Sequence, residues 1–514
     1  MKHLTLLKWV TVAISVATVG GIAMGKSGSK KTITVGVIGY WGGTSPAQQH
    51  TFVGGQVLQN RFEPLVGKDS KGILRPGGAK TWTISPDFKV FDFEIDTQIR
   101  FSDGSNLNAN DYKRSWEEAL RLEPKSANSS LLDLMYRIEG YEKFVTDGHL
   151  SGVEVISESR LVVRFREPFR MALDHFNGVR FSAFKNHNGE TIGTGPYTFG
   201  QEIPKDSKTM KLEPNPLYPD YGELTPIMLQ AVRAVDVGNL IAKGTIEAIF
   251  NTPGAWLPSD LSLSDQWETA LGPESYHINM LVNGTSGRLL SDLHMRQAVQ
   301  YLILKRVKES PRLAGNLEYF RYDPSIYLPF TAGRLENSEI VSMVLAGEKH
   351  VPELVTRSKS DPITLFWDAD CDSWMRETLE NAGVRLSSNS RLIKENYVSI
   401  SYKSSEYDLM TVGTSLRMGD PDGVYHILGK NGAITKPGIY RKLVDDLLEE
   451  GRSIIDLTKL DEHYQKVSRA VLTEVPFIHL GFSRSVTLYR KDRVRVDAAA
   501  IGRNAGRFDI FEAL

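Results

Sequence analysis

The chain has 514 residues, of which 41% are hydrophobic and 24% are charged, an ordinary composition for a soluble protein with two or three hydrophobic cores. Its formal net charge of −1 gives no global attraction to nucleic acid or to an anionic membrane surface. A single cysteine, Cys371, excludes an internal disulfide bond.

The N-terminus has the pattern of an export signal. Lys2 and Lys8 give a basic start, residues 9–25 carry no charge, and Ala23-Met24-Gly25 matches a small-x-small cleavage site. We therefore expect residues 1–25 to be a signal peptide and the mature chain to be periplasmic. The uncharged run is close to the minimum length that spans a bilayer, so an uncleaved anchor in the inner membrane is the alternative.

In the first half of the chain, strands outnumber helices. Alternating apolar residues predict a strand over residues 30–38, β-structure over 81–101 and two strands over 153–166. Asn108 and Asp111 have the spacing of a helix cap. Helices are also expected over residues 48–65 and 231–242, and a strand over 246–250.

In the second half, helices are more frequent. Residues 277–283 read as a buried strand, and a helix should follow the Ser291-Asp292 cap. Residues 313–359 look short and irregular, without a helix-rich pattern. The remaining expected elements are strands over 363–367 and 475–480 and helices over 374–382, 443–448 and 460–471.

The sequence lacks the motifs of common catalytic and metal sites. Its eleven histidines show no helical metal-binding spacing and no partner cysteine cluster. It has neither a G-x-S-x-G nucleophile motif nor a phosphate-binding glycine loop with lysine. We therefore expect no enzyme activity, no cofactor and no metal.

Several motifs in fixed order resemble one family. They are the stretch from Arg100 to Asp111, Gly193-Thr194-Gly195-Pro196-Tyr197, the segment Tyr407 to Tyr425 with its Asp-Pro-Asp, and Val475-Pro476-Phe477. Together they resemble the extracellular solute-binding proteins of family 5, the dipeptide-, oligopeptide- and nickel-binding proteins of ABC importers. Only residues 313–359 match poorly.

The resemblance implies an α/β fold with two lobes that close like a clamshell and an extra subdomain inserted in lobe one. The implied divisions are 32–65, 191–274 and 480–514 for lobe one, 66–190 for the inserted subdomain, and 275–479 for lobe two.

The ligand-facing positions depart from the family pattern. Family members carry a tryptophan after the glycine that is Gly413 here, and commonly an aspartate, which receives a peptide's α-ammonium, four residues before the proline that is Pro421 here. This chain has Thr414 and Arg417 at those positions. If Arg417 faces the cleft, a ligand with a carboxylate or phosphate should be preferred. The alternative is that this loop is shifted and that Asp420 or Asp422 receives an ammonium.

Two further segments are open to more than one interpretation. Tyr40-Trp41-Gly42-Gly43-Thr44 follows the first strand, where open α/β sheets bind ligands, but Trp41 could equally pack in the core. Asp420 and Asp422 flank Pro421 and are typical of a turn and helix cap. The candidate ligand-binding residues are Tyr40, Trp41, Gly42, Thr44, Thr414, Arg417, Asp420 and Asp422.

The resemblance implies that a monomer captures a small molecule or peptide between its lobes and delivers it to an ABC permease in the membrane. Nucleic acid is not an expected partner. The changes at Thr414 and Arg417 favour the alternative of a non-transport binding or scaffold protein with an altered or lost ligand site.

Overall fold

The computed structural model describes most of the chain after residue 30. The described residues are 31–39, 41–49, 51–69, 73–123, 131–187, 189–200, 208–219, 221–258, 261–311, 318–367, 373–392, 406–415, 420–430, 432, 438–497 and 507–514. The predicted signal peptide, Tyr40, Arg417 and Cys371 lie outside them. Within these ranges, no helix combines the length and apolar character needed to cross a bilayer.

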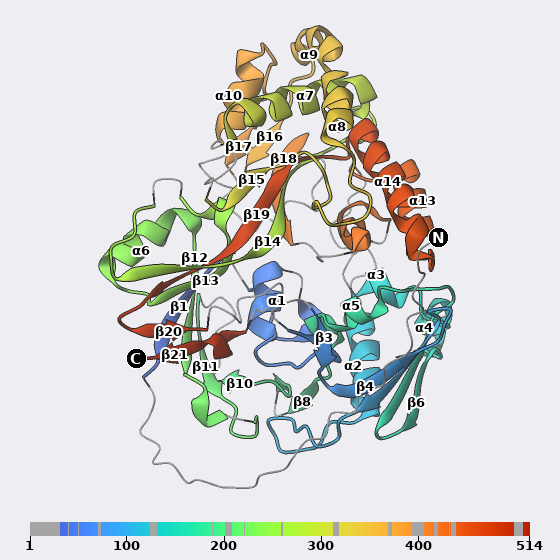
Figure 1. Cartoon of the computed structure of the whole chain (residues 1–514), viewed down its shortest axis with the longest axis vertical. Coiled ribbons are helices and arrows are strands. Elements are labelled where there is room, and N and C mark those ends of the chain that lie inside the picture. The colour runs from blue at the N-terminus through green and yellow to red at the C-terminus, as the bar shows by residue number, and fades with distance from the viewer. Residues whose placement is uncertain are drawn as a thin grey trace, which may run out of the picture.

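The largest sheet has eleven strands and extends through most of the molecule (Figure 1). From edge to edge its strands are β10 (Tyr197–Phe199), β11 (Thr209–Pro214), β12 (Ile227–Val232), β1 (Ile33–Ile38), β13 (Ala248–Pro253), β19 (Phe477–Arg490), β14 (Trp267–Val282), β18 (Leu409–Ser415), β16 (Leu365–Trp367) and β17 (Arg391–Leu392), with β15 (Phe320–Tyr322) paired to β19. β1 is parallel to both of its neighbours, β12 and β13. Central parallel strands are covered on both faces, which explains why the sequence of β1 is almost continuously apolar.

β14 and β19 join the two halves of this sheet. They have 16 and 14 residues and pair antiparallel with each other. β19 pairs with β13 on one side, and β14 pairs with β18 on the other. We call the part around β1 and β10–β13 the first lobe and the part around β15–β18 the second lobe. The pairing of β14 with β19 shifts register between Leu271 and Tyr276 and again between Ile278 and Asn279.

The second lobe has helices on both faces of its sheet (Figure 1). They are α7 (Leu293–Glu309), α8 (Asn337–Leu345), α9 (Val351–Ser358), α10 (Ser373–Asn381), α12 (Tyr425–Leu428), α13 (Lys442–Arg452) and α14 (Leu460–Glu474). Ile278 and Met280 pack with the core that contains the apolar stripe of α7, and Leu281 packs with the core that contains the stripe of α14. Adjacent residues of β14 thus face opposite sides, as the pleat requires.

Three sequence expectations for individual elements were wrong. Residues 313–359 contain two helices, α8 and α9, in their described part. The region expected as one helix over 231–242 begins instead inside β12, and the helix α6 spans Val237–Lys243. The helix expected over 48–65 is the shorter α1 (Phe52–Leu58), which begins after its N-cap Thr51. Short apolar runs do not distinguish a buried strand from a helix, which explains the second error.

A separate four-stranded antiparallel sheet lies beside the first lobe. Its order is β4 (Ala79–Ile84), β5 (Val90–Ile95), β7 (Arg160–Arg164) and β6 (Val153–Ser157). The neighbouring elements are β2 (Val66–Lys68), β3 (Leu74–Pro76), β8 (Lys185–His187), β9 (Glu190–Ile192), α2 (Ala109–Leu122), α3 (Leu132–Met135), α4 (Tyr141–Asp147) and α5 (Ala172–Phe176). The expected cap of α2 is confirmed, because Asn108 and Asp111 form a reciprocal capping box. We call residues 66–190 the subdomain, and these boundaries remain a prediction.

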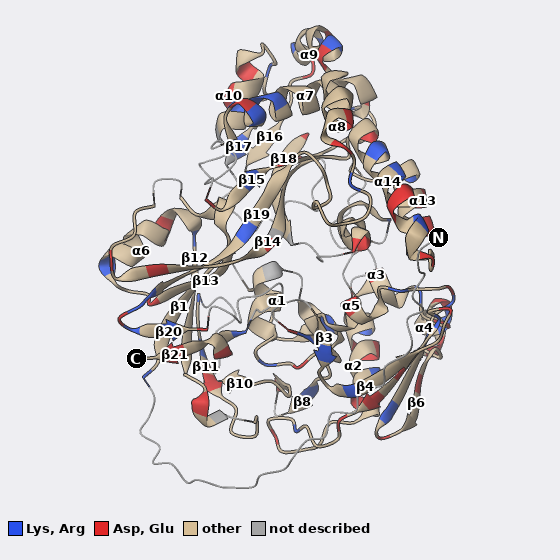
Figure 2. Cartoon of the chain, in the orientation of Figure 1, with Lys and Arg blue, Asp and Glu red and all other residues tan. Residues whose placement is uncertain are grey.

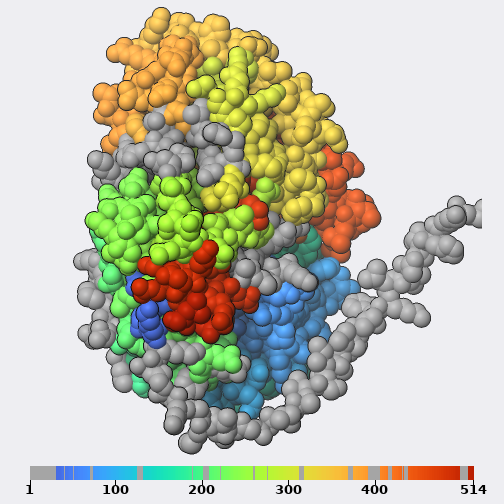
Figure 3. Space-filling view, turned by 60° about the vertical axis from the view of Figure 1, so that its left-hand side comes forward, coloured from blue at the N-terminus to red at the C-terminus, as the bar shows by residue number. Residues whose placement is uncertain are grey.

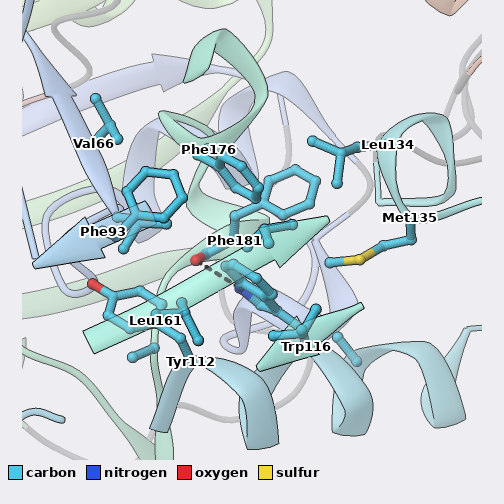
Figure 4. Packing of buried hydrophobic residues seen from close by; sticks show 14 of the residues in the cluster. Val66, Phe93, Tyr112, Trp116, Leu134, Met135, Leu161, Phe176 and Phe181 are labelled. Carbon is cyan, nitrogen blue, oxygen red and sulfur yellow. Dashed lines mark hydrogen bonds between the residues drawn. The ribbon is translucent and has the colours of Figure 1, made fainter. Parts of the chain in front are cut away.

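The subdomain has its own hydrophobic core, built around Trp116 (Figure 4). The indole stacks on Phe176 with ring centroids 5.2 Å apart, and its Nε1 donates a hydrogen bond to the Phe181 carbonyl at 2.9 Å. Leu58 and Phe62 belong to the same core although they precede residue 66. Subdomain and first lobe are therefore packed together continuously.

The C-terminal segment closes the first lobe. β20 (Val494–Val496) and β21 (Phe511–Ala513) form a short antiparallel pair. Phe508 and Phe511 pack in the same core as Val35 of β1. The red C-terminal residues accordingly lie beside the blue N-terminal strand on the surface shown in Figure 3.

Candidate functional site

Trp41, Gly42 and Thr44 lie in the first lobe, directly after β1. The Trp41 side chain is 2% exposed and belongs to the core of that lobe, which agrees with the core alternative. Its carbonyl accepts a hydrogen bond from the Thr51 hydroxyl at 3.3 Å. A Cβ at Gly54 would come within 2.2 Å of this carbonyl, so only glycine allows α1 to approach so closely. Gly42 has φ +74 and Thr44 is half-buried.

Thr414 lies near the end of β18 and points into a buried polar group on the second lobe. Its hydroxyl accepts a hydrogen bond from Asn279 Nδ2 at 3.1 Å. Asn279 Oδ1 in turn lies 2.9 Å from His479 Nδ1. The three residues come from β18, β14 and β19, so side chains that are distant in sequence form one connected chain of hydrogen bonds.

Asp420 and Asp422 are both engaged by arginines. Asp420 caps the turn at 421–424 by accepting from the Asp422 backbone N–H at 2.8 Å, as the turn-and-cap interpretation predicts. Its carboxylate also pairs with Arg170 of the subdomain at 2.7 Å. Asp422 accepts two hydrogen bonds from Arg452 at 2.8 and 3.0 Å. Neither carboxylate is left without a cationic partner, which disfavours either as the receiver of a ligand ammonium.

These pairs belong to a larger group, which we call the arginine cluster, between the subdomain and the second lobe. Its members are Asp133, Tyr136, Arg137, Arg170, Asp420, Asp422, Tyr425, Glu449 and Arg452. Both charge signs are otherwise dispersed over the helices and strands seen in Figure 2. The cluster differs because most of its charged side chains are removed from water.

Arg452 lies at the centre of the arginine cluster and has no exposed side-chain surface. It bonds to Asp133 of the subdomain at 2.7 Å and stacks over the Tyr425 ring at 3.4 Å. Burial alone would lower the pKa of Arg452, but the Asp133 and Asp422 carboxylates outweigh it and hold the pKa well above its ordinary value. One guanidinium thus joins two carboxylates from different parts of the clamshell.

Further contacts of the cluster cross the same boundary. The Tyr136 hydroxyl lies 3.0 Å from the Tyr425 hydroxyl and donates to Glu449 at 2.8 Å. Arg137 forms an ion pair with Glu449, and Arg170 also donates to the Gly451 carbonyl at 3.2 Å. These contacts, like Arg170–Asp420 and Arg452–Asp133, join the subdomain to the second lobe, so separating the two would break all of them together, whereas the Asp422–Arg452 pair lies within the second lobe.

A second buried feature is a pair of histidines on β14 and β19, the two strands that join the lobes. His277 of β14 and His479 of β19 are 0% and 3% exposed, and their ring centroids are 4.6 Å apart. Three of their ring nitrogens, both of His277 and the Nε2 of His479, have no hydrogen-bond partner among the described residues. Each such unpaired buried group costs about 1–3 kcal/mol.

Both histidines are held neutral. Burial, reinforced by His479 and His426, lowers the pKa of His277 well below its ordinary value. Burial also lowers the pKa of His479 to about 3; Asp323 opposes this shift, whereas Arg321 and Arg334 add to it.

The two histidines predict a pH dependence of stability. In the unfolded chain each binds a proton near pH 6.5, whereas folded His479 does so only near pH 3. The free energy of unfolding should therefore fall as the pH falls below 6.5, by about 1.4 kcal/mol per pH unit for each histidine. Urea unfolding of the wild type and of His277→Phe/His479→Phe at several pH values checks this, and the variant should lose most of the slope.

Asp420 has the opposite effect on the pH dependence of the unfolding free energy and therefore provides an internal control. Burial raises the pKa of Asp420 to about 6 although Arg170 opposes the shift. Protonation of this carboxyl between pH 6 and its ordinary 3.8 stabilises the folded state. In Asp420→Asn the free energy of unfolding should therefore fall more steeply with decreasing pH than in the wild type. A slope unchanged both here and in the histidine variant would contradict these pKa shifts.

The sequence did not predict most of these residues. Asp133, Tyr136, Arg137, Arg170, Glu449 and Arg452 lie on no motif, and their partners are hundreds of residues away. His277 offered one signal, because it is a titratable residue at the start of a predicted buried strand. Within the described ranges, no group of three or more metal-ligating side chains is gathered.

The comparisons with known proteins agree with this architecture. Residues 74–305 match the model of bacterial extracellular solute-binding proteins, family 5 middle. The periplasmic oligopeptide-binding protein of Haemophilus influenzae is 30% identical over 116 residues, which are 22% of this chain and 21% of that protein. The aligned stretch thus spans about a fifth of this curated relative.

Solved structures cover far more of the chain. A structure of the Escherichia coli murein tripeptide-binding protein MppA matches 94% of this chain and 99% of its own with a TM-score of 0.77 at 15% identity. The unliganded open form of MppA covers 94% and 98% with a TM-score of 0.61 at 14% identity. The lobes here therefore lie closer to the arrangement in the first structure than to the open one. The expected two-lobed α/β fold is confirmed, and residues 74–305 are similar to the bacterial extracellular solute-binding proteins of family 5.

Proposed function

We propose that this chain is the periplasmic binding component of an ABC importer that captures a peptide or peptide-like solute between its lobes and presents it to a membrane permease. The arginine cluster is the observation that most supports the proposal, because it joins the subdomain to the second lobe in a closed arrangement. Relatives named for oligopeptide and murein tripeptide binding support the solute class.

The mechanism follows from the two long strands. β14 and β19 connect both lobes, so the lobes can rotate about this junction while each keeps its own core. A solute that contacts both lobes binds the closed form more tightly and shifts the population toward it. The arginine cluster adds paired charges to the same closed form, since Arg137–Glu449, Arg170–Asp420 and Arg452–Asp133 join the subdomain to the second lobe.

The proposal predicts a retained solute and a ligand-dependent change in size. Chain purified from a periplasmic fraction should show, by native mass spectrometry, a mass above that of the polypeptide, and the excess should disappear on unfolding. After unfolding and refolding, small-angle scattering should give a larger radius of gyration, which decreases when the recovered solute is returned.

The same experiment distinguishes the alternative of a non-transport protein that lost its ligand site. In that case neither an excess mass nor a change in radius of gyration would be observed with any periplasmic extract. Chain recovered only with the membrane fraction and with Met1 intact would instead show that the N-terminal segment is an anchor.

A further inference from the structure

The histidine pair lies at the junction of the lobes. His277 shares its face of the sheet with Asn279, Thr414 and His479, because alternate residues of β14 face the opposite core. The neighbouring Tyr276 donates from its hydroxyl to the Asn251 carbonyl of the first lobe at 3.1 Å. This stretch of β14 therefore connects a polar face of the second lobe with the first lobe.

Several ring nitrogens on this face of the sheet have no hydrogen-bond partner among the described residues. Asn279 uses its amide N–H toward Thr414, so its Oδ1 accepts from His479 Nδ1. His479 Nε2 is consequently an acceptor, and in the described part of the chain no donor reaches it. His277, as a neutral imidazole, has one donor and one acceptor that are likewise unused. The face thus offers donors and acceptors side by side.

The charges around this face are balanced. The two histidines are neutral. The charged groups that act on His479 are Asp323, Arg321 and Arg334, and the Asp323 carboxylate pairs with both arginines, at 2.5 and 2.9 Å. A buried ammonium or carboxylate would find no free counter-charge among these groups and would lose its hydration. An uncharged group with one N–H and one C=O would match the two imidazoles without that loss.

We propose that His277 and His479 form a recognition subsite for an uncharged amide of the solute, so that the protein reads a peptide unit rather than a free terminus. His277 and His479 are specificity-determining residues, and each supplies the ring nitrogen that the fold leaves unused. The inference rests on the proposed function, because it assumes that a solute enters between the lobes.

The test compares two peptides that differ only in their ends. Calorimetry should show that N-acetyl-Ala-Ala-Ala-amide binds the wild type at least about tenfold more tightly than Ala-Ala-Ala with free termini. His277→Phe, which keeps an aromatic ring and removes both nitrogens, should weaken binding of the capped peptide by at least about tenfold. Its thermal stability should not decrease, because His277 makes no hydrogen bond to the described residues.

A matched control uses a histidine on the surface. His294→Phe, at an exposed position in α7, should bind both peptides as the wild type does. Equal affinity of the wild type for both peptides, or unchanged binding in His277→Phe, would show that the histidines only fill the core. If the wild type binds neither peptide but retains a solute in native mass spectrometry, the inference fails while the proposed function stands; loss of both results overturns both.

Discussion

Arg452→Met is expected to lower the free energy of unfolding by about 3–5 kcal/mol, because it leaves two buried carboxylates without their shared counter-charge. Asp133 and Asp422 are 1% and 4% exposed, so water cannot replace the lost guanidinium in the closed form. Urea unfolding measures the loss. Small-angle scattering of the same variant should show a larger radius of gyration, since opening hydrates both carboxylates.

Two controls separate charge from packing. Lys442 lies on the same helix, α13, in an exposed pair with Asp446, and Lys442→Met should cost less than about 1 kcal/mol. Adding Asp133→Asn and Asp422→Asn to Arg452→Met should recover more than half of the loss, because no buried charge is then unpaired. If the triple variant is as unstable as Arg452→Met alone, the effect comes from packing against Tyr425 and not from charge.

Trp116→Ala is expected to destabilise the chain by about 3–5 kcal/mol, the range for truncating a buried aromatic side chain. The indole is 0% exposed and contacts Phe176 and Phe181 in the subdomain core (Figure 4). Its hydrogen bond to the Phe181 carbonyl is lost as well. Urea unfolding followed by circular dichroism measures the change.

Leu122 provides the matched control on the same helix. It is 54% exposed at the end of α2, and Leu122→Ala should change stability by no more than about 0.5 kcal/mol. Leu134 and Met135 share the core with Trp116, and Asp133 directly precedes them. Trp116→Ala should therefore also enlarge the radius of gyration. If Trp116→Ala lowers the free energy of unfolding but leaves the radius of gyration unchanged, the subdomain core and the arginine cluster are independent.

Local features of the fold could be predicted from the sequence. The capping box of Asn108 and Asp111 depends on residues three apart, and the buried stripe of α14 depends on helical periodicity. Gly193 and Gly195 were recognised as part of a motif, and the structure gives the reason. A Cβ at either position would meet the Arg61 backbone within 2.5 Å. Such signals are local in sequence, so one chain is enough to find them.

The candidate site could be predicted only in part. The Asp420 cap was expected because the turn around Pro421 is local. The partners of this loop were not, since Asp133 and Arg452 are 319 residues apart and no periodicity connects them. His277 and His479 are likewise 202 positions apart, on the two strands β14 and β19 that bring them together. The proposed roles of Tyr40 and Arg417 remain predictions, because both lie outside the described residues.

The antiparallel pairing of β14 with β19 has a consequence for how the molecule can move. Two separate tethers would allow the lobes to twist and slide as well as swing. Here β14 and β19 are hydrogen-bonded to each other along most of their length. Twisting or sliding of one strand past the other would break this ladder of hydrogen bonds, so both motions are disfavoured. The breaks in register around residues 271–279 leave one place where the ribbon bends easily. Bending at this place is then the main motion left to the lobes, so under the proposed function every solute that closes them would bring their outer surfaces into the same relation.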